Sequence, residues 1–224
     1  MLKATLETIA KIVGGNLVTI SMKDKVVEGV STDTRDIKVQ NLFIPLVGEK
    51  FDGHNFVFDA IQKGAIATLW DKKHPPNYLD AGIIIVDDTL KAYQKLANSY
   101  LSATGAKVIG ITGSNGKTGT KDILASILEE KFRVHKTAKN LNNDIGLPKT
   151  IMEMDLDDEA VVLEMGMDRF GDIRTLTNIA KPDIAVITNI GDSHLQELGT
   201  KENIARAKFE ILEGLKPDGV FIFN

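Results

Sequence analysis

Residues 110–118 read Gly-Ile-Thr-Gly-Ser-Asn-Gly-Lys-Thr, and this stretch decides the fold of the second half of the chain. It follows the apolar pair at 108–109 and precedes a segment with helical periodicity. The apolar residues expected to share one face of that helix are Ile123, Leu124, Ile127 and Leu128. A strand, a glycine-rich turn and a helix in this order form a phosphate cradle, because backbone N–H groups turn inward and the helix N-terminus adds positive potential.

The end of this stretch carries the expected phosphate chemistry. Lys117 can reach terminal phosphate oxygens, and Thr118 can offer its hydroxyl to Mg²⁺. The common loop signature has glycine where Ile111 stands, so the match lies in the Gly-Lys-Thr end. The alternative is an ordinary glycine-rich turn with a surface lysine, and the order of strand, turn and helix disfavours it. The residues expected to bind nucleotide here are Gly113, Ser114, Asn115, Gly116, Lys117 and Thr118.

The composition is that of an ordinary soluble globular protein. The chain has 224 residues, of which 43% are hydrophobic and 26% charged, with a net charge of −4. The basic residues are outnumbered and do not cluster, which argues against nucleic-acid binding. No apolar run is long enough for membrane insertion, the N-terminus lacks a signal-peptide pattern, and the absence of cysteine excludes disulfides and thiolate metal sites. We therefore expect a cytoplasmic protein.

The pattern divides the chain into two domains. Residues 1–105 predict a small mixed α/β domain. Residues 106–224 alternate strand and helix, which predicts an α/β fold with a P-loop-type, mostly parallel sheet covered by helices on both faces. The strands expected in that sheet are 107–112, 133–137, 160–165, 183–188 and 219–223.

Two loops of the first domain carry more polar chemistry than a turn needs. One contains Ser31, Asp33 and Arg35 within five residues, and the other contains His54 after Asp52 and Gly53. Both also have structural readings, since Asp33 can cap a turn and a histidine can bond a backbone group.

Two strand ends of the second domain also carry polar groups. The strand at 160–165 contains Glu164, and Asn189 and His194 follow the strand at 183–188. Ligands of parallel sheets collect beyond the carboxyl ends of the strands, so these residues are expected near Lys117. There Glu164 and His194 can be ligands of a divalent metal, although a salt bridge or a capping histidine remains the alternative.

Lys208 interrupts an apolar stripe in the helix expected at 202–215. The stripe consists of Ile204, Ala207, Ile211, Leu212 and Leu215. An ammonium there must find an anion, lose its charge or be modified, and a position facing the phosphate and metal centre resolves the conflict. A further polar run, Asn140 to Pro148, contains three asparagines that can form a loop or bind a polar ligand.

These segments together resemble the Mur ligases, the ATP-dependent amide ligases of peptidoglycan synthesis. The asparagine run and the segment at 163–166 are most similar to the members that add D-Ala-D-Ala to UDP-N-acetylmuramoyl-tripeptide. The resemblance implies ATP and Mg²⁺ as cofactors and an acyl phosphate as intermediate. It also implies that Lys208 is carbamylated by CO₂.

The resemblance assigns roles residue by residue. It implies catalytic roles for Lys117, Lys208 and His194, and it adds Asn189 to the nucleotide-binding residues. The metal-binding residues it implies are Thr118, Glu164, His194 and Lys208. The substrate-binding residues it implies are Ser31, Asp33, Arg35, His54, Asn140, Asn142 and Asn143.

Family members have three domains, so the first domain is expected to bind the UDP-muramoyl peptide and the second to bind ATP. We expect the C-terminal ligase domain to be absent and this chain to be an inactive fragment of a protein that is a monomer at full length. One alternative is another Mur-type ligase or a folylpolyglutamate synthase. A second alternative is a nucleotide-binding module without catalysis.

Overall fold

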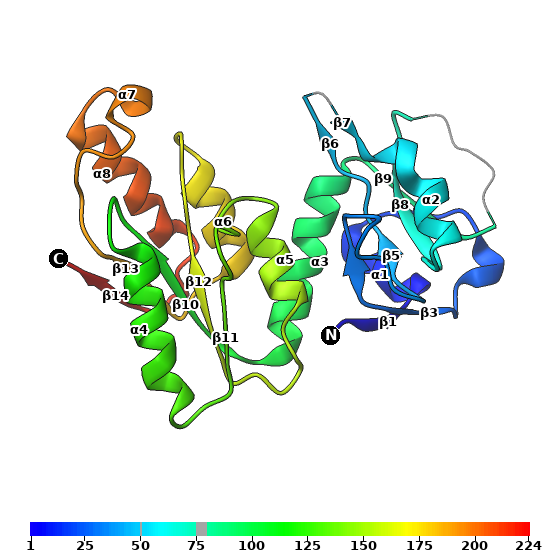
Figure 1. Cartoon of the computed structure of the whole chain (residues 1–224), viewed down its shortest axis with the longest axis horizontal. Helices are drawn as coiled ribbons and strands as arrows, with labels where there is room; N and C mark the ends of the chain where they lie inside the picture. Colours follow the sequence, from blue (N-terminus) through cyan, green and yellow to red (C-terminus); the bar gives the residue numbers. More distant parts are fainter. Residues whose placement is uncertain (50, 75–79) are drawn as a thin grey trace. The chain divides into compact units, whose positions relative to one another are not determined.

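The computed structural model describes residues 1–49, 51–74 and 80–224, which form two compact units, Met1–Ser99 and Tyr100–Asn224 (Figure 1). The boundary lies within the helix α3 (Thr89–Thr104). Within the described residues, no helix is both long and apolar enough to cross a bilayer. The ligands assigned to the two predicted domains stay predictions.

The first unit contains a five-stranded sheet with short helices packed against it. Its strands are β2 (Asn16–Leu17), β4 (Val30–Ser31), β5 (Leu42–Phe43), β8 (Ala67–Asp71) and β9 (Gly82–Val86). They stand in the order β2-β9-β8-β5-β4, and only β2 pairs antiparallel to its neighbour. Two antiparallel pairs accompany the sheet: β1 (Lys3–Thr5) with β3 (Val26–Glu28), and β6 (Val47–Gly48) with β7 (Phe51–Asp52).

Two helices of this unit, α1 (Leu6–Val13) and α2 (Val57–Gln62), bury apolar residues. The unit also contains two 3₁₀ turns, η1 (Ile20–Met22) and η2 (Gly53–Phe56). Thr5 begins α1, because its hydroxyl accepts the Thr8 N–H at 3.2 Å. On α2, Val57 and Ala60 pack with Trp70 of β8 in one buried cluster.

The second unit contains a parallel sheet in the order β11-β12-β10-β13-β14. Its strands are β10 (Lys107–Thr112), β11 (Val134–Lys136), β12 (Ala160–Glu164), β13 (Ile184–Ile187) and β14 (Val220–Phe223). The five predicted strands are confirmed to within one residue at each end. The strand order reverses at β10, because β11 and β12 lie on one side of it and β13 and β14 on the other. In parallel sheets a ligand crevice forms at such a point, beyond the carboxyl end of the strand.

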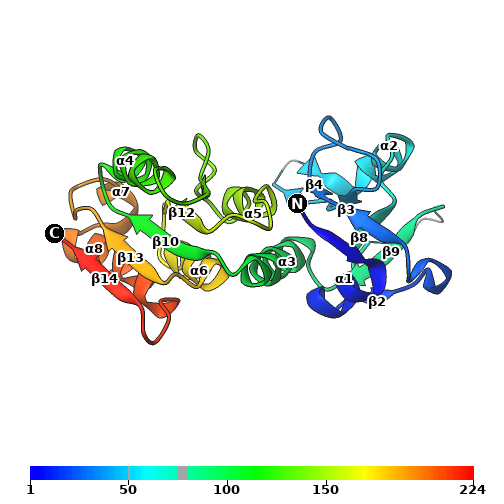
Figure 2. The same ribbon diagram turned by 90° about the horizontal axis from the view of Figure 1, so that it is seen from below.

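Helices cover both faces of this sheet (Figure 2). They are α4 (Lys117–Glu129), α5 (Gly146–Met152), α6 (Asp172–Ala180), α7 (Leu195–Leu198), α8 (Lys201–Phe209) and the 3₁₀ turn η3 (Glu210–Glu213). Side chains alternate along a strand, so Ile109 and Ile111 pack with Ala125 of α4. Gly110 points to the other face, where a Cβ would lie 3.6 Å from Ile211 of η3.

Two helix predictions need correction. Ile123 and Ile127 are 66% and 64% exposed whereas Leu124 and Leu128 pack against the sheet, so the expectation that these four residues share one face of α4 is wrong. Leu124 and Leu128 each lie about 100° round the helix from the isoleucine before them, and Ala125 packs beside them. The helix expected at 202–215 ends at 209 and continues as η3.

Candidate nucleotide and metal site

The loop between β10 and α4 needs glycine at two positions. Gly113 has φ 153° and Gly116 has φ 80°, conformations that other residues rarely adopt. A Cβ on Gly113 would also lie 1.9 Å from the Thr188 hydroxyl oxygen, so the loop passes directly beside the end of β13. Lys117 folds back over this loop, and its Nζ donates to the Gly113 carbonyl at 2.9 Å.

The segment after β13 holds the same loop from the other side. The Asn189 side-chain oxygen accepts the Asn115 N–H at 2.9 Å, and its carbonyl accepts the Ser114 N–H at 3.1 Å. The Thr188 hydroxyl donates to the Asn115 carbonyl at 2.6 Å. Asn189 therefore lies at the predicted nucleotide loop and is bonded to its backbone.

Glu164 lies beside the start of α4 and is 3% exposed. Its Oε2 accepts the Thr118 hydroxyl at 2.9 Å, and its Oε1 accepts the Asn142 amide at 2.8 Å. The structure thus joins three predicted site residues from three separate segments. Hydroxyl and carboxylate oxygens are the donors that Mg²⁺ prefers, so Thr118 and Glu164 fit that ion.

An open cavity of about 700 Å³ adjoins Lys117. The predicted site residues that line it are Lys117, Asn140, Asn142, Asn143 and His194. Its other lining residues are Asp144, Gly166, Met167, Asp168, Arg169, Asp172, Thr175 and Leu176. The cavity is therefore surrounded mainly by polar and charged groups, which suits a polar ligand.

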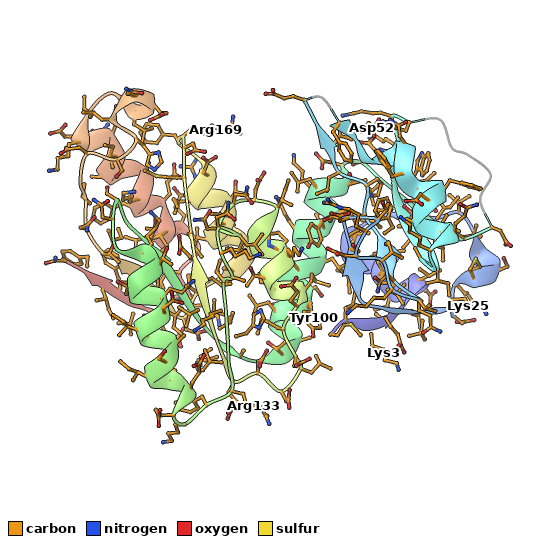
Figure 3. The ribbon with its side chains drawn as sticks, in the orientation of Figure 1. Lys3, Lys25, Asp52, Tyr100, Arg133 and Arg169 are labelled. Atoms are coloured by element: carbon orange, nitrogen blue, oxygen red, sulfur yellow. The ribbon has the colours of Figure 1, made fainter. Side chains whose placement is uncertain are left out.

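Asp168 and Arg169 on this cavity were missed by sequence reasoning. They follow the end of β12, where Figure 3 labels Arg169, and the rule that ligands collect beyond strand ends could have found them (Figure 3). Oδ1 of Asp168 lies 3.6 Å from Nδ1 of His194, so the two side chains are neighbours at the cavity. Asn143 also has a structural task, since its side-chain oxygen accepts the Gly146 N–H at 2.7 Å at the start of α5.

Lys208 is 1% exposed, as its place in the apolar stripe predicts. No hydrogen bond or ion pair to its ammonium is found among the residues that the structure describes. Burial, with the positive charge of Lys117 adding to it, lowers the pKa of Lys208 to about 8. The uncharged amine is therefore about one tenth of this side chain at pH 7, far more than for a surface lysine.

A second cavity of about 540 Å³ lies in the first unit. Its lining residues are Thr32, Asp33, Thr34, Arg35, Phe43, Phe51, Phe56 and Asp59. The Arg35 guanidinium bonds both carboxylate oxygens of Asp33, and the rings of Phe51 and Phe56 stack with centroids 5.2 Å apart. The Ser31 hydroxyl instead closes a turn, because it accepts the Asp33 N–H at 3.1 Å.

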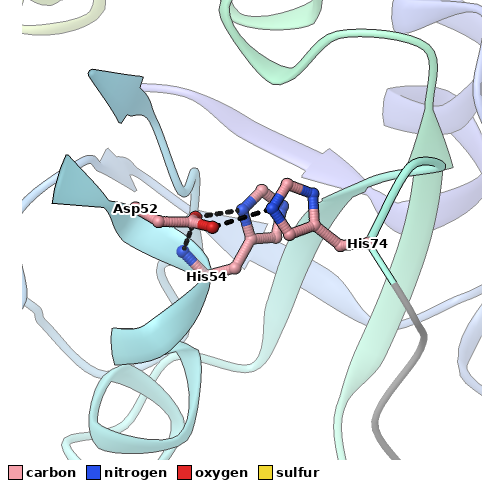
Figure 4. Close-up of side chains that lie close together, drawn as sticks. All are labelled: Asp52, His54 and His74. Carbon is pink, nitrogen blue, oxygen red and sulfur yellow. Dashed lines mark hydrogen bonds and ion pairs between the residues drawn. The ribbon is translucent and has the colours of Figure 1, made fainter. Parts of the chain in front are cut away.

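His54 is buried in a cluster with Asp52 and His74 (Figure 4). Its Nδ1 bonds Asp52 at 2.8 Å, its Nε2 accepts the Asp71 N–H at 3.1 Å, and its ring stacks on His74 with centroids 3.8 Å apart. Burial opposes the charge of Asp52, but hydrogen bonds from the backbone and ring of His54 and from His74 outweigh it and lower the Asp52 pKa to about 2. Burial also lowers the pKa of His54.

The hydrogen bonds of this cluster give it a structural role. Its three side chains lie close enough to suggest a metal site, with ligand atoms within 4.8 Å of one another. The Asp71 N–H occupies the Nε2 lone pair of His54, so Nδ1 carries the proton given to Asp52. The two rings are also nearly parallel, at 11°, and cannot direct in-plane lone pairs at one ion.

The sequence matches known families over most of its length. Residues 111–224 match the Mur ligase middle domain, and residues 26–101 match the Mur ligase family, catalytic domain. The UDP-N-acetylmuramoyl-tripeptide–D-alanyl-D-alanine ligase of Bacillus subtilis (strain 168) is 52% identical over 223 residues, which are 100% of this chain and 49% of that protein.

Solved structures agree with these matches. MurF from Acinetobacter baumannii superposes with a TM-score of 0.92 at 32% identity, covering 100% of this chain and 49% of that one. MurF ligase from Thermotoga maritima, solved in complex with ADP, superposes with a TM-score of 0.81 at 35% identity, covering 88% of this chain and 45% of that one. The chain spans about half the length of the curated relatives it matches. It belongs to the Mur ligase family.

Proposed function

We propose that this chain is part of an ATP-dependent ligase that joins D-Ala-D-Ala to UDP-N-acetylmuramoyl-tripeptide. The observation that carries the proposal is the meeting of the phosphate loop, Glu164 and a polar cavity in a chain 52% identical to the Bacillus subtilis ligase. The terminal carboxylate of the tripeptide attacks the γ-phosphorus of ATP, which forms an acyl phosphate and releases ADP. The amine of D-Ala-D-Ala then attacks the acyl carbon, which forms the amide, releases phosphate and gives up a proton.

The phosphate loop has the task of holding ATP in that reaction. We assign residues 113–118 and Asn189 to the phosphates of ATP. The N–H groups of residues 116–118 and the Lys117 ammonium would bind and orient the phosphates, while Asn189 holds the loop in shape through the Ser114 and Asn115 N–H groups. Positioning and charge neutralisation are then the main catalytic effects. The ADP bound to the Thermotoga maritima relative supports this assignment. When bound, Mg²⁺ supplies positive charge to the phosphates, and Thr118, Glu164 and His194 are the residues we assign to it.

Lys208 is the residue we assign to CO₂. The lowered pKa of about 8 leaves part of the Lys208 amine uncharged near neutral pH; this form attacks the carbon of CO₂, and the new N–C bond with loss of one proton gives a carbamate. This reaction replaces a buried cation beside Lys117 by an anion, which is the more favourable neighbour for that lysine and a further oxygen ligand for metal.

The cavity of each unit suits one part of the acyl substrate. In the first unit, Arg35 and the Phe51–Phe56 pair supply a cation for a diphosphate and an aromatic surface for a uracil ring. Ser31, Asp33 and His54 are expected to shape the substrate site of that unit, because their hydrogen bonds fix its loops. In the second unit, the amides of Asn140, Asn142 and Asn143 face the cavity that would receive the peptide.

We further propose a cytoplasmic monomer as the working form. The proposed substrates, two nucleotides and a dipeptide, are water-soluble, and the residues assigned to catalysis all come from one chain.

The proposal is tested by phosphate release from a protein that carries this chain at the length of its relatives. We expect release with ATP, Mg²⁺, UDP-N-acetylmuramoyl-tripeptide and D-Ala-D-Ala together, no release without D-Ala-D-Ala, and loss of activity in Lys208→Ala. Release with a single amino acid in place of D-Ala-D-Ala would indicate another Mur-type ligase. Nucleotide binding without acceptor-dependent release would indicate a binding module.

A further inference from the structure

Three hydrogen bonds connect α4, Thr137 and the end of β12 in a closed ring. The Thr118 hydroxyl donates to Oε2 of Glu164 at 2.9 Å, and the Glu164 N–H donates to the Thr137 hydroxyl oxygen at 2.9 Å. The Lys121 ammonium donates to the Thr137 carbonyl at 2.8 Å and so returns to α4. We name these four residues, Thr118, Lys121, Thr137 and Glu164, the Glu164 circuit.

The register of the sheet explains why Thr137 reaches Glu164. β11 and β12 are parallel, and Lys136 pairs with Val162. The Thr137 N–H continues this ladder by donating to the Val162 carbonyl at 3.0 Å, so its side chain lies beside the last residue of β12. Thr118 and Lys121 are three residues apart on α4 and therefore lie on the same side of that helix.

Lys121 is a buried charge that the proposed chemistry leaves unused. It is 4% exposed, Thr137 is 1% exposed, and the Lys121 ammonium has Asp122 at 3.3 Å as its ion partner. Burial of an ammonium costs free energy that an apolar residue at the same place would not. The lysine is therefore suited to a specific task, which is to hold the Thr137 carbonyl.

We propose that Thr137, held by Lys121, is a positioning residue that fixes Glu164 for the divalent cation bound with the nucleotide. The inference rests on the proposed function, because it assumes that Glu164 is a metal ligand. Groups that orient a metal ligand affect metal affinity although they do not touch the ion. Thr137 would fix the backbone of Glu164, while Thr118 and Asn142 orient the carboxylate.

The test compares the affinity for the fluorescent nucleotide mant-ADP with Mg²⁺ and with EDTA in place of Mg²⁺. In Thr137→Val the Glu164 N–H loses its acceptor, whereas Thr137→Ser keeps it. Thr150→Val is the matched control, since it removes an equally buried hydroxyl that bonds only the Gly146 carbonyl of its own helix, at 3.1 Å. All measurements are made well below the unfolding temperature of each variant.

We expect Thr137→Val to weaken Mg²⁺-dependent binding about 10-fold, with binding in EDTA unchanged, as for other groups that orient metal ligands. Thr137→Ser and Thr150→Val are expected to match the parent chain in both conditions. Lys121→Met provides the second variant, and it should reproduce the Mg²⁺-specific loss even if Thr137→Val does not fold.

Equal weakening of binding with and without Mg²⁺, or no change in either folded variant, would overturn the positioning role. A parent chain that binds no mant-ADP in either condition would instead contradict the proposed function, and the inference with it. If Mg²⁺ does not change the affinity of the parent chain for mant-ADP, Glu164 is not a metal ligand. The inference then fails, while the nucleotide site of the proposed function stands.

Discussion

At the scale of single residues, the chain places charged groups where burial changes their chemistry. Lys208 is uncharged far more often than a surface lysine, because burial disfavours its ammonium form. Asp52 instead keeps its charge, because hydrogen bonds to its carboxylate outweigh the cost of burial and lower its pKa. Each shift leads to a measurable dependence on pH.

The Lys208 amine is expected to form a carbamate that increases with pH at constant dissolved CO₂. Only the neutral amine reacts, and the lowered pKa of about 8 makes about half of it neutral at pH 8, against about 0.3% for an ordinary lysine. With ¹³C-labelled CO₂, NMR should show one carbamate resonance that rises between pH 7 and 9 and is absent in Lys208→Met. An identical resonance in that variant would assign the carbamate to another amine.

Asp52→Asn is expected to lower the free energy of unfolding of the first unit by about 1–2 kcal/mol at neutral pH. The folded pKa of about 2 lies below the ordinary value of 3.8, so the ionised Asp52 stabilises the fold above about pH 4. This stabilisation is lost as pH falls through about 2, and the difference between the parent and the variant should shrink accordingly.

Fluorescence of Trp70 can follow this unfolding, because the chain has one tryptophan and its ring packs edge-on against His54 at 5.1 Å. Asp87→Asn is the control: Asp87 forms an exposed ion pair with Lys72, and solvent screening means that its loss should leave the stability essentially unchanged. A difference for Asp52→Asn that is the same at neutral pH and near pH 2 would contradict the electrostatic account.

At the scale of elements, the phosphate loop depends on contacts between the ends of β10 and β13. Asn189 and Thr188 bond the backbone of the loop, and Gly113 allows the close approach that these bonds require. The loop is therefore built by two strands, and its shape depends on both.

Gly113→Ala is expected to destabilise the second unit more than Gly116→Ala does. Both substitutions strain a left-handed backbone, which costs about 1–2 kcal/mol. At Gly116 no atom lies within 4 Å of the new Cβ, whereas at Gly113 the Cβ meets the Thr188 side chain and adds about 1–3 kcal/mol. Urea unfolding followed by circular dichroism measures both; equal losses would show that β13 can move away from the loop.

The sequence predicts the elements of the second unit well, because apolar periodicity and glycine-rich turns are local properties. It also places Glu164, Asn189 and His194 at strand ends, where the parallel sheet brings them to one edge. The Glu164 circuit could not be predicted, since it depends on the register of β11 against β12. The outward orientation of Ile123 and Ile127 was missed for a similar reason: periodicity alone does not say which of two adjacent apolar rows meets the sheet.

The first unit was predicted less completely. The crowding of polar groups in residues 31–35 was compatible with a binding loop or a capped turn, and the structure places a cavity there. The Phe51–Phe56 pair and the burial of His54 against His74 depend on contacts between distant segments, which the sequence pattern does not contain.

At the scale of the whole molecule, each compact unit is assigned its own nucleotide, ATP to the second unit and the uridine diphosphate group to the first. The phosphate loop with Glu164 belongs to the second unit, and the cavity with Arg35 and the two phenylalanines belongs to the first. If this assignment is right, each ligand can be lost without the other.

Amide NMR titrations of the ¹⁵N-labelled chain with ADP plus Mg²⁺, and separately with UDP, show which unit binds each nucleotide. ADP is expected to shift residues 110–118 and Asn189, and UDP to shift residues 31–35 with Phe51. Lys117→Met should weaken ADP binding about 10-fold or more through loss of a charge-assisted hydrogen bond and leave UDP binding unchanged, while Arg35→Ala should do the reverse. ADP shifts centred on residues 31–35, or variants that weaken both ligands equally, would contradict the account.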